Sequence, residues 1–344
     1  KIPENILLGC DVEIGIGLMS FDDEHIGIFG AKISLFTRQE MVTFALSYPA
    51  VPIYMDYFTY LLFRINVFFF QFVPFRILYG LADLVFYVVY YIAGYRKKVV
   101  FANLRKAFPG KTDQEIHSIA RSFYHHLADL LIESMKAFTM PEERVIERYR
   151  YRNISMLEDL YRQGKSVICV AAHYGNWEWG GVASGRQLLH KPVGFYKPLS
   201  NRSIDRFVRK TRVKGRSELA SIMQTAETFR NSYNEPAIFY MVADQSPSSA
   251  RLAIWVDFLN QETASLHGPE KYARIYNFPV VYAISRKIKR GRYEVDFKML
   301  EPNPSETKTG EITRRFMKVL EEDIIREPRY YLWSHRRWKL SRAG

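Results

Sequence analysis

From residue 166 onward, the chain alternates between two kinds of hydrophobic pattern. Short runs rich in Val, Ile, Phe and Tyr are separated by longer segments with helical periodicity. Runs of this length and composition are typical of buried strands. They predict strands at 167–172, 191–196, 235–243, 278–285 and 293–300. Because strands and helices alternate, we expect an α/β fold whose central, mostly parallel or mixed sheet is flanked by helices.

A different pattern, apolar almost throughout, runs from residue 57 to residue 95. It contains three charged residues and one proline: Arg64, Arg76, Asp83 and Pro74. These residues interrupt every window long enough to cross a bilayer, which disfavours one long transmembrane helix. Two shorter apolar helices on or dipping into a membrane fit better, with tyrosines and the basic run 96–98 at the headgroups. The alternative is a buried helical hairpin in a soluble core.

The segment 112–138 is amphipathic and predicts a helix, with Thr112 as N-cap and Glu115 as its capping-box partner. His125, Asp129 and Glu133 repeat every four residues, which also suits a metal site. A metal needs ligands from elsewhere as well, and the sequence offers no second matching cluster. We therefore interpret these residues as a polar helix face and expect neither a metal nor a cofactor.

Composition narrows the class of partner. The 344 residues are 48% hydrophobic and 15% aromatic, which excludes a disordered chain. The formal charge of +13 favours an anionic partner, either a nucleic acid, a membrane surface or an acidic substrate. The two cysteines, Cys10 and Cys169, are too few for a disulfide framework, and Cys169 is expected to pack as a small hydrophobe.

The same patterns divide the chain into three parts. We expect an N-terminal extension of unclear role at 1–56, apolar membrane-associated helices at 57–98, and an α/β domain at 99–344. The extension carries a weak six-residue period of the kind found in parallel β-helices. Three imperfect turns cannot form a stable solenoid alone, so this period carries no fold assignment.

The strongest candidate for chemistry follows the strand at 167–172. His173 and Glu178 stand in a His-x4-Glu spacing, with a potential turn at Gly175 between them. One ideal helix would place the two side chains about 140° apart, but a bend between strand and helix brings them together. A carboxylate bound to one imidazole nitrogen leaves the other nitrogen free as a general base. A lone His near a Glu is commonly structural, whereas a position at a strand end favours catalysis.

These residues resemble a known family. The run HYGNWE is similar to the first motif of the late acyltransferases of lipid A biosynthesis, the lauroyl/myristoyl transferases. The resemblance extends from about residue 72 to residue 339. It includes a Tyr-x-Pro-Leu motif at Tyr196, an Asp-Gln motif at Asp244, and a closing Trp-x-His-Arg-Arg signature near the C-terminus. A simple Asx-turn is the alternative for Asp244.

A strongly basic segment, 196–216, contains eight Lys and Arg residues. Arginines at helical spacing on one face suit phosphate, which the guanidinium group binds through two hydrogen bonds. The resemblance implies that Arg206 and Arg209 serve substrate phosphates or the charge at the active site. A solvated basic helix is the alternative. RNA binding also uses such patches, but no nucleic-acid recognition motif accompanies this one, so we expect no nucleic-acid partner.

The resemblance implies an O-acyltransferase. It would move a fatty acyl chain from an acyl-carrier-protein or CoA thioester to a hydroxyl of a lipid A precursor or related anionic glycolipid. His173 and Glu178 would be catalytic, and Asn176, Tyr196, Arg206, Arg209 and Asp244 would bind substrate. Arg206, or the backbone N–H groups near Gly175 and Asn176, would stabilise the oxyanion. The expected location is the cytoplasmic face of a bacterial inner membrane. The alternatives are a membrane-bound lipid esterase and a non-catalytic basic protein that binds membrane or RNA.

Overall fold

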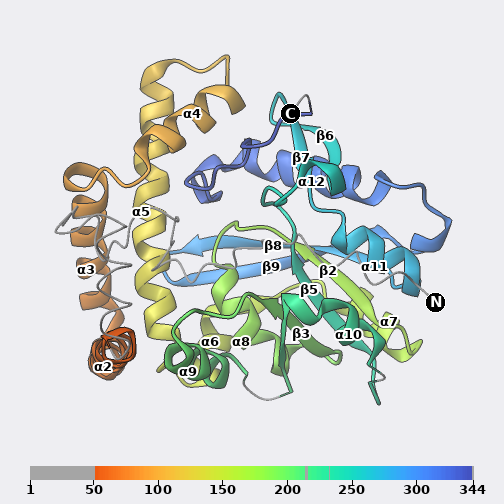
Figure 1. The fold of residues 1–344 in the computed structure, drawn as a ribbon, viewed down its shortest axis with the longest axis horizontal. Helices are drawn as coiled ribbons and strands as arrows, with labels where there is room; N and C mark the ends of the chain where they lie inside the picture. Colours follow the sequence, from red (N-terminus) through yellow and green to blue (C-terminus); the bar gives the residue numbers. More distant parts are fainter. Residues whose placement is uncertain (1–50, 214–215, 232, 343–344) are drawn as a thin grey trace.

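A seven-stranded sheet forms the centre of the molecule (Figure 1). The computed structural model describes residues 51–213, 216–231 and 233–342; Cys10, the six-residue period and most of the predicted extension lie outside this range. The strand order is β1-β9-β8-β2-β5-β3-β4, and β9 runs antiparallel to β8 while the other neighbours are parallel. The strands are β1 (Tyr149–Tyr151), β2 (Val167–Ala171), β3 (Lys191–Tyr196), β4 (Glu218–Ser221), β5 (Ala237–Val242), β8 (Val280–Lys289) and β9 (Arg292–Glu301).

All five predicted strands are confirmed, as β2, β3, β5, β8 and β9. The short strands β1 and β4 were missed because three or four residues are too few to establish a period. Two further strands, β6 (Ile254–Phe258) and β7 (Gln261–Ser265), form a separate antiparallel hairpin. Its two turn residues, Leu259 and Asn260, both have positive φ, as a tight hairpin turn requires.

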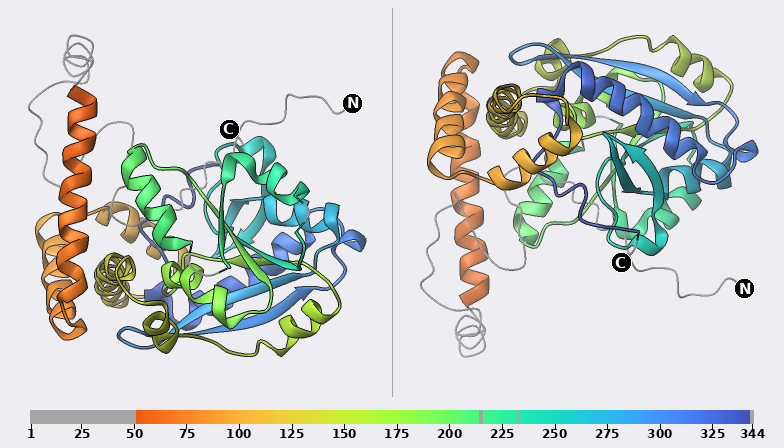
Figure 2. Two further views of the ribbon diagram at one scale, coloured as in Figure 1. Left: turned by 90° about the horizontal axis from the view of Figure 1, so that it is seen from below. Right: turned by 90° about the horizontal axis from the view of Figure 1, so that it is seen from above.

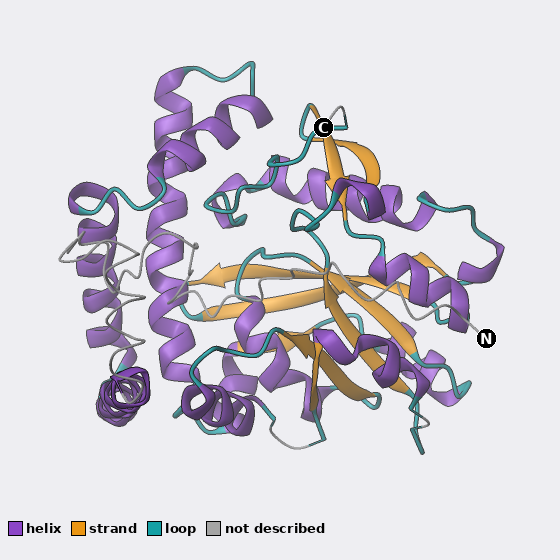
Figure 3. Cartoon of the chain, in the orientation of Figure 1, coloured by secondary structure: helices purple, strands orange, loops and turns teal. Residues whose placement is uncertain are grey.

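Helices cover both faces of the sheet (Figure 3). Alternate residues of β2 point to opposite faces: Ile168 and Val170 join one apolar cluster, and Val167 and Cys169 join the other. Cys169 is fully buried there, as predicted. One cluster includes side chains from α4 (Lys97–Ala107), α5 (Asp113–Ala137), α11 (Gly268–Tyr276) and α12 (Glu311–Arg326). The other includes side chains from α6 (Glu142–Arg148), α7 (Ser155–Arg162) and α8 (Trp177–Gln187).

Helix α5 stands at one end of the sheet and confirms the predicted amphipathic helix (Figure 1). Its N-terminus carries the predicted capping box. The Glu115 backbone N–H donates to Thr112 Oγ1 over 3.3 Å, and the Thr112 backbone N–H donates to a Glu115 carboxylate oxygen over 2.9 Å. These bonds satisfy donors that a helix start leaves unpaired, which fixes where α5 begins.

The apolar segment forms α2 (Val51–Phe72) and α3 (Phe75–Tyr87), the latter extended by a π-helical turn, Val88–Ile92. The break falls at Pro74, as predicted, because proline cannot donate the backbone hydrogen bond of a helix interior. Many large apolar side chains of both helices are exposed, including Phe68, Phe69 and Ile77. One described stretch, Phe75–Ile92, is long and apolar enough to span a membrane, with 22% of its residues buried.

Helix α2 runs along one side of the molecule and contacts α5 and α9 (Arg202–Arg212) (Figure 2). The Lys136 ammonium group on α5 donates to the backbone carbonyls of Phe70, Gln71 and Val73 over 2.6 to 3.1 Å. A cation at this position satisfies carbonyls that the helix end leaves unpaired and matches the negative end of its dipole. The α5–α2 contact therefore fixes where α2 ends.

Candidate functional site

The centre of the candidate site lies where β2 and β5 end. The two strands are parallel neighbours, and Ala171 pairs with Val242 in their register. His173 follows β2 by two residues and Asp244 follows β5 by two residues, so the register places them side by side. The backbone N–H of Ala243 donates to the carbonyl of Ala171 over 3.0 Å and continues the pairing to this edge.

His173 Nδ1 lies 2.8 Å from a carboxylate oxygen of Asp244. The residues are 1% and 2% exposed, so the pair is shielded from solvent. Burial by itself would raise the pKa of Asp244, but the adjacent His173 and its hydrogen bond bring that pKa below its ordinary value. An ionised Asp244 accepts a hydrogen bond from Nδ1–H and leaves Nε2 as the basic nitrogen. Asp244, which was expected to bind substrate, therefore contacts His173 and is the carboxylate that orients its ring.

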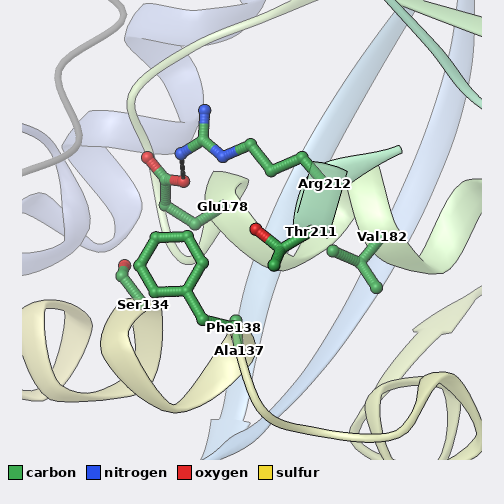
Figure 4. A pocket seen from close by; sticks show the side chains of 7 residues that line it. All are labelled: Ser134, Ala137, Phe138, Glu178, Val182, Thr211 and Arg212. Carbon is green, nitrogen blue, oxygen red and sulfur yellow. Dashed lines mark hydrogen bonds and ion pairs between the residues drawn. The ribbon is translucent and has the colours of Figure 1, made fainter. Parts of the chain in front are cut away.

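The predicted hydrogen bond between His173 and Glu178 is wrong, because Asp244 occupies Nδ1. Glu178 instead forms a salt bridge with Arg212, the last residue of α9, and the two side chains are 6% and 17% exposed. Both line a small pocket between α5, α8 and α9, with Phe138 and Val182 among its apolar walls (Figure 4). Sequence reasoning selected Arg206 and Arg209 and missed Arg212, which shares their helical spacing.

The turn between β2 and α8 is fixed by its backbone. Gly175 has φ of +65°, and a Cβ atom there would lie 2.1 Å from the carbonyl oxygen of Ser285, so only glycine fits. The Gly175 N–H donates to the Tyr330 carbonyl over 3.1 Å, and the Asn176 N–H donates to Ser285 Oγ over 3.3 Å. These N–H groups, expected to face an oxyanion, are already paired within the protein.

The Asn176 side chain lies in the interior and is 0% exposed. Its oxygen accepts the Trp179 backbone N–H over 3.1 Å, and its amide nitrogen donates to Glu133 over 2.8 Å. Both ends of the amide are therefore used inside the protein. The expected substrate contact is corrected to an N-cap of α8, which explains why Asn precedes the helix.

Polar side chains of α5 contact the turn between β2 and α8. His126 Nε2–H donates to the Gly175 carbonyl over 3.1 Å. Burial lowers the pKa of His126 to about 3, so its ring is neutral. The Glu133 carboxylate is fully buried and accepts hydrogen bonds from Tyr79, Asn176 and Tyr293 over 2.7 to 3.0 Å.

The other candidate ligands of the α5 face also have partners. Asp129 pairs with Lys287 and Arg290, and the His125 ring stacks on Phe86. Among residues 51–213, 216–231 and 233–342, no three His, Cys, Asp or Glu side chains are grouped as metal ligands.

The basic residues Arg206 and Arg209 are exposed and line a groove on α9 with Arg202, Asp205, Lys210 and Val213. This groove confirms that the arginines share one face. Tyr196, at the end of β3, is buried; its hydroxyl donates to Asp205 over 3.4 Å, and the Arg209 guanidinium lies 5.8 Å from its ring centroid. Tyr196 therefore supports the groove from within the protein, whereas the arginines face solvent.

Gln245, which the sequence analysis noted only as part of a motif, contacts the basic nitrogen. Its side-chain amide nitrogen lies 3.4 Å from His173 Nε2, and its Oε1 is buried without a hydrogen-bond partner among the residues that the structure describes. The next residue is held by the closing segment, because the Ser246 backbone N–H donates to His335 Nε2 over 3.1 Å. Arg337 is fully buried and donates to the Ala264 carbonyl over 2.6 Å. The closing signature thus packs next to the site through His335.

Comparison with known proteins gives a consistent result. A family model described as bacterial lipid A biosynthesis acyltransferase matches residues 50–340. A lipid A biosynthesis lauroyltransferase of Escherichia coli (strain K12) is 24% identical over 253 residues, which cover 72% of this chain and 81% of that protein. A palmitoleoyltransferase of the same strain is 22% identical over 256 residues, which cover 72% of this chain and 80% of that protein.

Proposed function

Because the chain belongs to the bacterial lipid A biosynthesis acyltransferase family, we propose that it moves a fatty acyl chain from a thioester to a hydroxyl group of a lipid A precursor or related anionic glycolipid. The observation that carries the mechanism is the buried His173–Asp244 pair. It supplies an oriented imidazole, with Nε2 as the acceptor nitrogen, at the end of a strand, where α/β enzymes commonly place their chemistry.

In the proposed reaction, His173 Nε2 removes the proton from the acceptor hydroxyl as its oxygen attacks the thioester carbonyl carbon. The imidazolium that forms is stabilised by Asp244. The C–S bond then breaks, the thiolate leaves, and the proton on Nε2 passes to the sulfur. The products are an ester and a free thiol. A positioned general base contributes roughly a hundred- to ten-thousand-fold in rate.

The oxyanion of the tetrahedral intermediate needs a donor that the fold has not already used. We propose Arg212, in place of Arg206, as this donor, because it lines the same pocket as Glu178. Glu178 follows His173 by five residues in the sequence. Its guanidinium has more N–H groups than the Glu178 salt bridge uses. In this proposal Glu178 acts on Arg212 and fixes the direction of the positive charge.

Two surfaces support a membrane-bound acceptor. The segment 57–98 exposes apolar and aromatic side chains of α2 and α3, which suits the boundary of a bilayer. The groove of Arg202, Arg206, Arg209 and Lys210 suits phosphate on a lipid headgroup. We propose that the protein acts at the cytoplasmic face of a bacterial inner membrane, where an acidic acyl carrier protein, or CoA, delivers the acyl chain.

A transfer assay tests this proposal. Purified protein is incubated with an isotope-labelled acyl-carrier-protein thioester, or the matching CoA thioester, and a lipid A precursor. Mass spectrometry then identifies the product. We expect an acylated glycolipid with the wild-type protein and none with His173→Ala. Free fatty acid formed at the same rate with and without acceptor would indicate an esterase. Acyl transfer that persists in His173→Ala would exclude His173 as the base.

A further inference from the structure

The basic nitrogen of His173 is covered in this structure. Nδ1 is bonded to Asp244, and the amide nitrogen of Gln245 lies 3.4 Å from Nε2. The His173 residue is 1% exposed and Gln245 is 4% exposed, so no substrate hydroxyl reaches Nε2 in this arrangement. A base that accepts a hydroxyl proton needs that hydroxyl within about 3 Å, so one of the covering groups has to move.

Of the two side chains bonded to the His173 ring, Gln245 is held less tightly than Asp244. Asp244 is held by His173, and the backbone of Ser246 is held by His335. Within the described part of the chain, the Gln245 amide, in contrast, has one long hydrogen bond, and its Oε1 is buried without a partner. An unpaired buried carbonyl oxygen costs free energy, so a rotation that gives Oε1 a partner is favourable. The backbone on both sides therefore stays in place while this side chain turns.

We propose that Gln245 is a gate on the basic nitrogen of His173. In the resting enzyme its amide N–H donates to Nε2 and keeps water away. The acceptor hydroxyl displaces the amide and takes its place as donor to Nε2. The base is therefore accessible only when acceptor is bound. This inference rests on the proposed role of His173 as general base. It gives Gln245, which takes no part in the proposed acyl transfer, a role in the enzyme before acceptor binds.

The gate is tested without any turnover, by the reaction of diethyl pyrocarbonate with neutral histidine nitrogens followed by peptide mapping. Exposed His117 serves as the internal reference. In the wild-type protein we expect slow modification of His173. In Gln245→Ala we expect a rise of roughly five- to tenfold, the factor that one neutral hydrogen bond commonly carries. The matched control is Gln163→Ala, at an exposed glutamine on the surface.

Gln245→Glu supplies a second test in case the alanine variant fails to fold. A carboxylate beside Nε2 favours the protonated ring, so modification of His173 should begin at higher pH than in the wild type. Unchanged modification of His173 in folded Gln245→Ala, or an unchanged pH dependence in Gln245→Glu, would overturn the gate. If His173 becomes reactive as expected but no enzyme form transfers an acyl group, the gate stands and the proposed function fails.

The gate also has a consequence for the products. With the amide removed, water reaches Nε2 in the absence of acceptor. We therefore expect Gln245→Ala to release more free fatty acid from the thioester, relative to acyl transfer, than the wild type does. A ratio of hydrolysis to transfer equal to that of Gln163→Ala would count against the gate.

Discussion

At the scale of single residues, Asp244 and Glu178 have different partners and therefore different expected effects. Replacing Asp244 with Asn removes the charge that stabilises the imidazolium and no longer fixes the tautomer of His173. We expect Asp244→Asn to lower kcat by roughly a hundred- to ten-thousand-fold and to change the pH–rate profile. Asp159→Asn, at an exposed aspartate of α7, is the matched control.

The Glu178→Gln variant should behave differently from Asp244→Asn. It weakens the hold on Arg212 but leaves the Asp244 hydrogen bond intact, so kcat should fall without displacement of the acid limb of the pH–rate profile. If Glu178→Gln moved that limb and Asp244→Asn did not, the sequence-based pairing of His173 with Glu178 would be restored.

Both carboxylates were selected from the sequence, but their partners were not. Glu178 is close to His173 along the chain, which made it the natural partner. Asp244 is 71 residues away and reaches the ring only because β2 and β5 are adjacent and in register. Strand order is set by packing over the whole sheet, so a local pattern does not contain it. A useful signal was available, since His173 and Asp244 each follow a buried strand, and the carboxyl ends of neighbouring parallel strands meet at one edge of the sheet.

At the scale of elements, the end of α2 depends on one side chain of α5. Lys136→Met leaves the carbonyls of Phe70, Gln71 and Val73 without their donor. We expect a loss of about 1–3 kcal/mol in the free energy of unfolding and faster proteolysis near Pro74. Thermal unfolding and limited proteolysis measure these effects. Lys165→Met, at an exposed lysine, should change neither. Equal proteolysis in both variants would show that α2 ends there without help.

Elements with a strong local period were predicted well, including α5 with its Thr112 cap and the break at Pro74. The hairpin β6–β7 was not. Its second strand reads Gln-Glu-Thr-Ala-Ser, which has little β-branched or aromatic character. It is held as a strand by tertiary contacts, because Arg337 donates to the Ala264 carbonyl and Trp338 donates to Thr263. A propensity argument cannot find a strand that distant residues hold in place.

At the scale of the whole molecule, buried neutral histidine makes stability depend on pH. The pKa of His126 falls from 6.5 to about 3 on folding. Between these values the unfolded chain binds a proton that the folded protein does not, so the free energy of unfolding falls as the pH falls. The effect is absent above about pH 6.5 and reaches at most about 1.4 kcal/mol per pH unit below it.

Chemical unfolding near pH 7 and near pH 5 measures this dependence. His126→Gln keeps a donor for the Gly175 carbonyl but does not titrate, so its stability should fall less on acidification than that of the wild type. His117→Gln, at an exposed histidine, is the control and should behave as the wild type does. An identical pH dependence in all three proteins would contradict the prediction.

The exposed apolar side chains of α2 and α3 predict which surface of the molecule binds a membrane. Ile77 on α3 is 63% exposed, and Ile325 on α12 is 57% exposed. We expect Ile77→Glu to weaken binding to anionic phospholipid vesicles in a flotation assay, and Ile325→Glu to leave binding unchanged. Added salt should weaken binding of the wild type, because the basic surface contributes. Equal binding by both variants would place the membrane contact elsewhere.

Helix α9 faces two ways. Its outer side carries the cationic groove, and its last residue reaches inward to Glu178. In the proposed function, this one helix positions both the lipid headgroup and Arg212, so neither can shift without moving the other. Acceptors that fit the groove poorly should therefore turn over slowly even at saturating concentration. Evolution of a new acceptor preference would require compensating changes around Arg212 and Glu178.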